Sequence, residues 1–86
     1  MFIEVVTPDE KIYEGEVESA TFPGSDGSFQ VLNNHAPLIS TLGSGDLKMI
    51  KLVDKKPQTI IYNLEGGVVE VLNNKVTVLA EKIITE

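Results

Sequence analysis

Apolar and polar residues alternate with a period of two along most of this 86-residue chain. Turn-forming residues, mainly glycine, proline and asparagine, interrupt the alternation at short intervals. The helical spacing of apolar residues at i, i+3, i+4 and i+7 does not persist over three turns anywhere. Regular short alternating segments separated by turn signals are typical of an all-β sandwich or barrel, and we expect that fold class here.

The alternation divides the chain into nine expected strands, at residues 2–7, 11–13, 17–22, 28–32, 38–42, 46–53, 58–64, 68–72 and 75–81. Glycines at 43, 45, 66 and 67 mark the ends of four of them. In the third segment the apolar positions change from odd to even near Glu18 and Ser19. One extra residue reverses the face of every later side chain, so this change predicts a β-bulge.

The last two expected strands form the clearest hairpin, because only Asn73 and Asn74 separate them. Asparagine tolerates a positive φ, which both central residues of a type I′ turn require. A two-residue turn fixes the register of the strands that it joins. The predicted register brings valines together on one face, Val71 opposite Val76 and Val69 opposite Val78.

Composition narrows the classes of partner and site. A formal charge of −6, from 13 acidic and 7 basic residues, argues against nucleic acid as the main partner. The chain has no cysteine, so neither disulfides nor thiolate metal sites are possible. No apolar run approaches the ~20 residues of a membrane helix, and the first residues do not resemble a signal peptide. We therefore expect one soluble domain spanning residues 1–86.

The segment at residues 22–47 is the densest in turn residues and contains the only histidine, His35. A catalytic histidine needs a nucleophile and an orienting carboxylate within reach, and Asp26, Ser28 and Ser40 are near it in sequence. No nucleophile motif surrounds either serine. We favour a loop histidine that hydrogen-bonds to the backbone, and an enzyme that uses His35 remains an alternative.

Two other kinds of site find little support in the sequence. One histidine and scattered carboxylates do not give the ligand spacing of a metal site, and we expect neither a metal nor a cofactor. The stretch at residues 24–27 is rich in glycine but lacks the Lys-Ser/Thr pair of a phosphate-binding loop. Loops that a rigid scaffold presents often carry function, so an interaction surface is the preferred interpretation.

Three ordered blocks of the sequence resemble the epsilon subunit of F-type ATP synthases. The first two are the opening block, with Val5, Val6, Thr7, Pro8 and Asp9, and the central block, with Pro23, Gly24, Ser25, Asp26 and Gly27 followed by the run from Val31 to Leu38. The third begins at Gly66-Gly67 and continues through residues 74–81. The resemblance covers nearly the whole chain. It implies the N-terminal domain of that subunit, a β-sandwich of about ten strands.

The resemblance also implies a function without an active site or a cofactor. Members of the family join the gamma subunit to the c-subunit ring in the rotor and couple proton transport to ATP synthesis. The implied contact residues are Asp26, Gly27 and Ser28, which would face the c ring, and Asn34, His35, Ala36, Pro37 and Leu38 near the same rotor interface. The location implied is peripheral, on the cytoplasmic face of the bacterial inner membrane.

The chain departs from the family pattern at two points. Members often carry a carboxylate at the position of Ser28 and a glycine at that of Gln30, which argues against an ionic contact through Ser28. Typical members continue as a two-helix domain that brakes ATP hydrolysis, whereas this sequence stops where those helices would begin. We expect a naturally short form, with a truncated chain as the alternative. A stand-alone ligand-binding or scaffolding sandwich is the other function to test.

Overall fold

The computed structural model describes residues 1–84, and every regular element within them is a β-strand. The strands are β1 (Phe2–Val6), β2 (Lys11–Glu16), β3 (Ser19–Gly24), β4 (Gly27–Leu32), β5 (Leu38–Val53), β6 (Lys56–Leu72) and β7 (Lys75–Ile84). They form one hydrogen-bonded sheet in the order β2-β1-β7-β6-β5-β3-β4. Only β1 and β7 pair in parallel, and the other neighbours are antiparallel.

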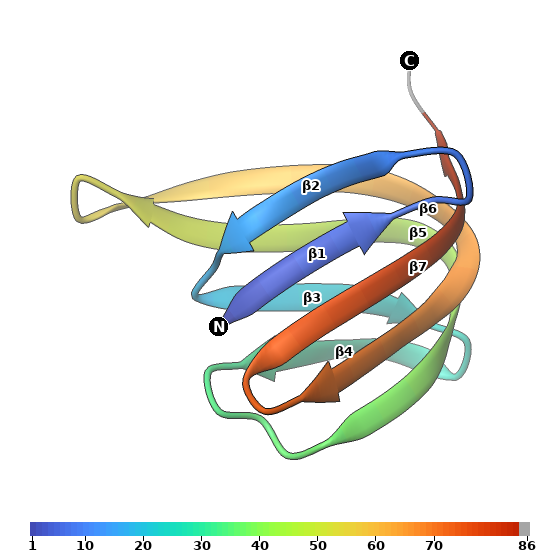
Figure 1. Cartoon of the computed structure of the whole chain (residues 1–86), viewed down its shortest axis with the longest axis horizontal. Coiled ribbons are helices and arrows are strands. Elements are labelled where there is room, and N and C mark those ends of the chain that lie inside the picture. Colours follow the sequence, from blue (N-terminus) through green and yellow to red (C-terminus); the bar gives the residue numbers. More distant parts are fainter. Residues whose placement is uncertain (85–86) are drawn as a thin grey trace.

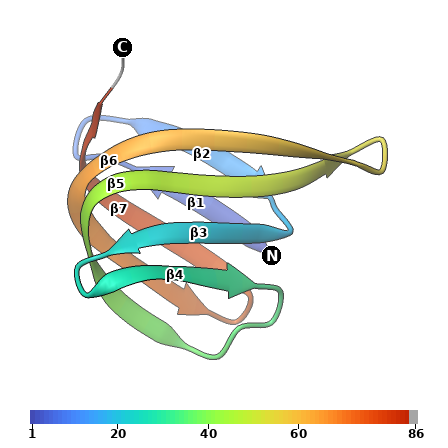
Figure 2. The same ribbon diagram turned by 180° about the vertical axis from the view of Figure 1, so that it is seen from behind.

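This single sheet folds over on itself into two layers, as the opposite views in Figures 1 and 2 show. One layer contains β2, β1, β7, the last part of β6 and the first part of β5. The other contains β3, β4, the last part of β5 and the first part of β6. β5 and β6 are 16 and 17 residues long, enough to run through both layers. The expected all-β, sandwich-like domain is therefore confirmed.

The expected number of strands, nine from the alternation and about ten from the resemblance, is not confirmed, because the structure has seven within residues 1–84. The alternation predicted that strands end at Gly43–Gly45 and at Gly66-Gly67. In the structure β5 and β6 continue through these two places. Gly45, Gly66 and Gly67 have positive φ. A glycine with positive φ can bend a strand sharply without ending its pairing, as in a β-bulge.

The core lies between the two layers and is built from the predicted inward faces. In the first layer Ile3, Val76 and Val71 form one buried row across three strands. The other layer supplies a second set of fully buried side chains, which are Ala20, Phe22, Val31, Leu47, Met49 and Leu64. The Phe22 ring stacks on Phe29 with 5.4 Å between centroids. Alternation with period two therefore identified the buried face correctly.

Two hairpin turns contain a pair of neighbouring residues with positive φ. Asn73 and Asn74 have φ of 51° and 60°, and the predicted register of β6 and β7 is confirmed at all four pairs from Leu72–Lys75 to Val69–Val78. Asp54 and Lys55 form the other turn and join β5 to β6. Figures 1 and 2 show this end of the β5–β6 hairpin projecting beyond the rest of the molecule.

The β-bulge expected near Glu18 and Ser19 is wrong. β2 ends at Glu16 and β3 begins at Ser19, so the change in apolar phase falls between two strands. Val17 lies in this connection, where it is buried and donates a backbone hydrogen bond of 2.9 Å to the Met1 carbonyl oxygen. A new strand can begin with either face inward, which removes the need for an extra residue.

Candidate functional site

The turn at residues 26–28 lies between β3 and the beginning of β4. Asp26, Gly27 and Ser28 are all exposed. Gly27 has a φ of 127°, a conformation that a side chain would strain, and Gly24 pairs with it across the turn. The neighbouring Ser25 N–H donates to the Thr41 carbonyl oxygen at 3.1 Å, which ties this turn to β5. The turn therefore presents a polar surface, and its backbone is hydrogen-bonded to β5.

The loop at residues 34–38 follows the other end of β4. Asn34, His35, Ala36 and Pro37 are exposed, while Leu38 begins β5 and packs against the core. The Asn34 backbone is in the left-handed region, with a φ of 61°. The His35 N–H donates to the Leu32 carbonyl oxygen at 3.2 Å, which turns the chain after β4.

The structure does not bring these two groups of residues into one cluster. β4 has six residues and lies between them. At about 3.3 Å per residue, the 26–28 turn and the 34–38 loop are roughly 20 Å apart. Figure 2 shows the two connections at opposite ends of β4. A partner that touched both groups would have to follow the full length of this strand.

This separation removes the geometry that the enzyme alternative requires. His35 Nδ1 lies 2.7 Å from the Ala36 carbonyl oxygen, so the ring nitrogen is bonded to backbone, as the sequence predicted for a loop histidine. Asp26 and Ser28, the carboxylate and hydroxyl considered as its partners, are at the far end of β4. Ser40 Oγ donates to the Thr41 carbonyl oxygen at 3.2 Å. No triad is assembled from these groups.

Metal and membrane sites were also sought in the described part of the chain. Residues 1–84 contain no group of three or more His, Asp or Glu side chains placed to hold a metal ion. The same residues include no helix long and apolar enough to cross a membrane.

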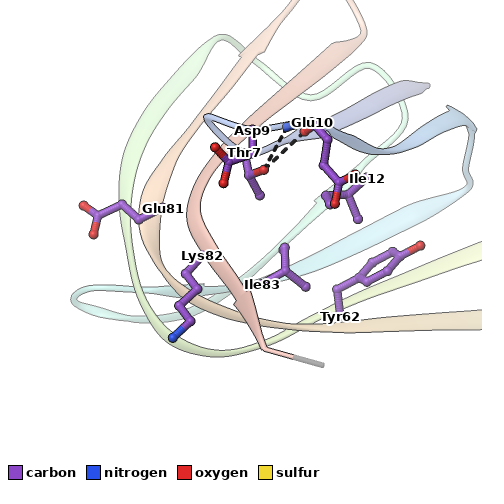
Figure 3. Close-up of a pocket in the computed structure, with 8 residues that line it drawn as sticks. All are labelled: Thr7, Asp9, Glu10, Ile12, Tyr62, Glu81, Lys82 and Ile83. Carbon is purple, nitrogen blue, oxygen red and sulfur yellow. Dashed lines mark hydrogen bonds between the residues drawn. The ribbon is translucent and has the colours of Figure 1, made fainter. Parts of the chain in front are cut away.

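An open pocket of about 270 Å³ lies where the β1–β2 connection meets β6 and the end of β7 (Figure 3). Ile12, Tyr62 and Ile83 form its apolar side. Its charged groups do not converge, because Glu81 and Lys82 point away from that side in Figure 3. A specific ligand site needs a few polar groups directed at one point. This pocket therefore gives the ligand-binding alternative no support.

Exposed apolar side chains flank the 34–38 loop, and of these the sequence did not point to Ile39 or Leu72. Ile39 is 72% exposed, and Leu32 and Leu72 are each about half exposed. Residues 37–39 and 70–72 line a shallow hollow of about 360 Å³ beside the loop. The period-two alternation of β5 could have identified Ile39 as outward-facing. In the structure it pairs with the exposed Glu70 on the outer face. A cluster of exposed apolar side chains is typical of a protein-binding surface.

An ion-pair network covers the outer face of β1 and β2. The Lys11 ammonium donates a hydrogen bond to Glu14 and lies 3.1 Å from Glu4 Oε2. This hydrogen bond and the positive charge of Lys11 lower the pKa of Glu14. The hydrogen bonds to Glu14 and then Glu4 raise the pKa of Lys11. All three groups face solvent, so the network organises the surface more than it stabilises the fold.

Replacing Lys11 with methionine is expected to raise the pKa of Glu14 toward its ordinary value, because the donor and its charge are lost. Glu14 titrates lower in the fold than when unfolded, so its pairing stabilises the fold above the unfolded-state pKa. That contribution disappears as the pH falls through the folded-state pKa. NMR titration of Glu14 measures the shift, with Lys51→Met as the control. An unchanged Glu14 titration in K11M would contradict the network.

Fold and surface together define a class of protein: an all-β domain folded into two layers, with exposed loops at both ends of one strand. The chain belongs to the ATP synthase delta/epsilon chain family, and residues 1–86 match the family's beta-sandwich domain. The structure of residues 1–84 agrees with that description, since it consists of strands folded into two layers. The family resemblance seen in the three sequence blocks is therefore confirmed.

The relatives are bacterial proteins named ATP synthase epsilon chain. The chain is 39% identical to that of Leptospira interrogans over 79 residues and 40% identical to that of Salinibacter ruber over 87 residues. These matches cover 92% and 94% of this chain but only 59% and 58% of the relatives. The match to the Chlorobium limicola protein, at 40% identity, covers 94% of this chain and 89% of the relative.

Two solved structures share the fold at low sequence identity. One comes from the central stalk and c ring of the Tetrahymena thermophila mitochondrial ATP synthase, with a TM-score of 0.82 at 17% identity. It covers 96% of this chain, which spans 64% of the Tetrahymena chain. The other comes from the Euglena gracilis mitochondrial ATP synthase, also with a TM-score of 0.82, at 21% identity over 95% of this chain and 51% of the other.

Proposed function

We propose that this chain is a non-catalytic subunit of the central stalk of an F-type ATP synthase, where it links the gamma subunit to the c-subunit ring. In this role it couples proton transport to ATP synthesis as part of the rotor. The observation that carries the proposal is the match of residues 1–86 to the beta-sandwich domain of the family. The implied location is peripheral, on the cytoplasmic face of the bacterial inner membrane.

The two ends of β4 suit two different partners. The 26–28 turn presents Asp26 and the Ser28 hydroxyl, a polar surface that suits the polar loops of a c ring. The 34–38 loop contains exposed Pro37 and is followed by exposed Ile39, and the core of a stable protein interface is apolar. We therefore assign the 26–28 turn to the c ring and the 34–38 loop to the gamma subunit.

The sandwich is proposed to transmit torque and not to brake hydrolysis. The regular elements of residues 1–84 are all strands, so this part of the chain has no helix to insert into the catalytic head. The extensive pairing of β5 with β6 and β7 ties both ends of the domain to one continuous sheet. A continuous sheet resists bending more than a flexible linker would, which suits a component under torque.

The test is binding of the chain to the gamma subunit and the c ring from the same organism. Asp26→Lys is expected to weaken c-ring retention at least tenfold and to leave gamma binding unchanged. Ile39→Asp should do the reverse, and it should fold normally because Ile39 is exposed. Asp9→Lys is the control, an exposed charge reversal in the β1–β2 connection, whose strands lie at the opposite edge of the sheet from β4. Surface plasmon resonance with each partner measures the affinities.

Retention of neither partner by the wild-type chain would overturn the proposed function. Equal effects of D26K and I39D on both partners would leave the rotor role intact but contradict the assignment of one partner to each end. Loss of binding in the D9K control would show that charge alone, and not the position of the contact, decides the affinity.

A further inference from the structure

The side chain of Asn74 connects the β6–β7 turn to the loop after β4. Its Oδ1 accepts a hydrogen bond of 2.7 Å from the Asn34 N–H. Its Nδ2 donates at 3.1 Å to Asn33 Oδ1, which also accepts from the Met1 ammonium at 2.7 Å. The backbone carbonyl of Asn74 accepts from the Phe2 N–H at 3.1 Å, which anchors the turn to β1. One amide group therefore fastens two consecutive loop residues from 40 positions away in sequence.

The other hydrogen bonds of this loop are local. The His35 N–H bonds to Leu32, and the His35 ring bonds to Ala36. Both bonds hold the loop to itself or to the strand just before it. At the end of the loop, Leu38 begins the pairing of β5 with β6 opposite Val71. At its start, the contacts of Asn33 and Asn34 with Asn74 and Met1 hold the loop against the first layer. The exposed backbone of Asn34, at a φ of 61°, is thus held by a distant side chain.

We propose that Asn74 is a positioning residue, which holds the 34–38 loop in the conformation that its protein partner recognises. The inference rests on the proposed function, in which this loop contacts the gamma subunit. A loop that is already ordered loses less conformational freedom when it binds, and pre-organisation of this kind increases affinity. Asn74 would thus act on binding without touching the partner.

Neighbouring residues of the turn provide a matched pair of variants. Asn74→Gly removes the amide but keeps the turn, because glycine adopts positive φ readily and asparagine followed by glycine favours a type I′ turn. Asn73→Gly changes the other turn residue, whose φ is also positive. No side-chain hydrogen bond of Asn73 is present among residues 1–84. N74G therefore removes the side-chain hydrogen bonds to the loop after β4, whereas N73G keeps them.

Hydrogen exchange of the isolated chain tests the contact without any partner. The Asn34 amide of N74G should exchange about five- to tenfold faster than in the wild type, the range expected for loss of one hydrogen bond. N73G should leave it unchanged. Asn74→Asp should keep the protection, because a carboxylate still accepts from the Asn34 N–H. Unchanged exchange of Asn34 in N74G would overturn the proposal.

Binding to the gamma subunit tests the positioning role. N74G is expected to bind about tenfold more weakly than N73G, although the two should unfold at the same denaturant concentration. A difference in affinity without one in global stability is a result that a purely structural role would not produce. Faster exchange with unchanged affinity would overturn the positioning role. If the wild-type chain does not bind gamma, the proposed function fails, whereas the exchange rates still decide whether Asn74 holds the loop.

Discussion

Replacing Phe22 with alanine is expected to lower the free energy of unfolding by about 3–5 kcal/mol, the range for removing a fully buried aromatic side chain. Phe22 has no exposed surface and stacks on Phe29. A chain of this length has a total stability of roughly 4–13 kcal/mol. The substitution should therefore remove a large share of the stability. Urea denaturation followed by circular dichroism measures it.

Ile39→Ala is the control for this experiment, since 72% of the Ile39 surface is already exposed. Its effect should stay within about 0.5 kcal/mol, as for most surface substitutions. A loss below about 1 kcal/mol for F22A would mean that the space left by the ring closes almost completely. That result would contradict a tightly packed interior between the two layers.

Replacing Gly67 with alanine is expected to cost about 3 kcal/mol or more, because two penalties combine. The residue has a φ of 137°, which side chains other than that of glycine strain to adopt. An added Cβ would also lie 2.3 Å from the Leu79 carbonyl oxygen and 2.9 Å from Ala80 Cα. Both atoms belong to the backbone of β7 and cannot move without disturbing the sheet. The midpoint of urea unfolding measures the loss.

Gly43→Ala provides the comparison within the same pair of bent strands. The nearest atoms to an added Cβ at Gly43 are 3.9 Å away, and its φ is not positive. This substitution should be nearly neutral or stabilise by up to about 1 kcal/mol, because alanine restricts the unfolded chain. Equal losses of stability in G67A and G43A would contradict this prediction. They would show that replacing any glycine of these strands is costly and that the close approach at Gly67 adds nothing.

Local patterns in the sequence predicted the parts of the fold that depend on neighbouring residues. Two asparagines in a two-residue turn fixed the pairing of β6 with β7, since the turn leaves only one register for Val71 and Val76. Alternation also placed Val69, Val71, Val76 and Val78 on one face, and all four are buried. Each of these features depends on the side chains and backbone freedom of a short segment, so the sequence could predict it.

Features that depend on distant residues were harder to predict. Glycines such as Gly67 end strands in many proteins, but here the facing strands on both sides hold β6 together through the bend. The role of Asn74 was not foreseen, because its partners Asn33 and Asn34 come from another part of the chain. The sequence predicted β4 as a strand. It did not show that this strand places residues 26–28 and residues 34–38 at opposite ends.

The projecting end of the β5–β6 hairpin leaves part of the backbone open to association with other chains. Within residues 1–84, residues 51–53 pair only with residues 56–58, and residues 59–62 pair only with residues 47–50, so the outer edges of 51–53 and 56–62 have no partner strand. Unpaired edges of this kind invite a strand from a second molecule. Lys51, Lys55, Lys56 and Pro57 lie along this segment, and charge and proline both discourage such pairing. The lysines of this acidic protein and Pro57 therefore disfavour its association with a second copy through the edge of the hairpin.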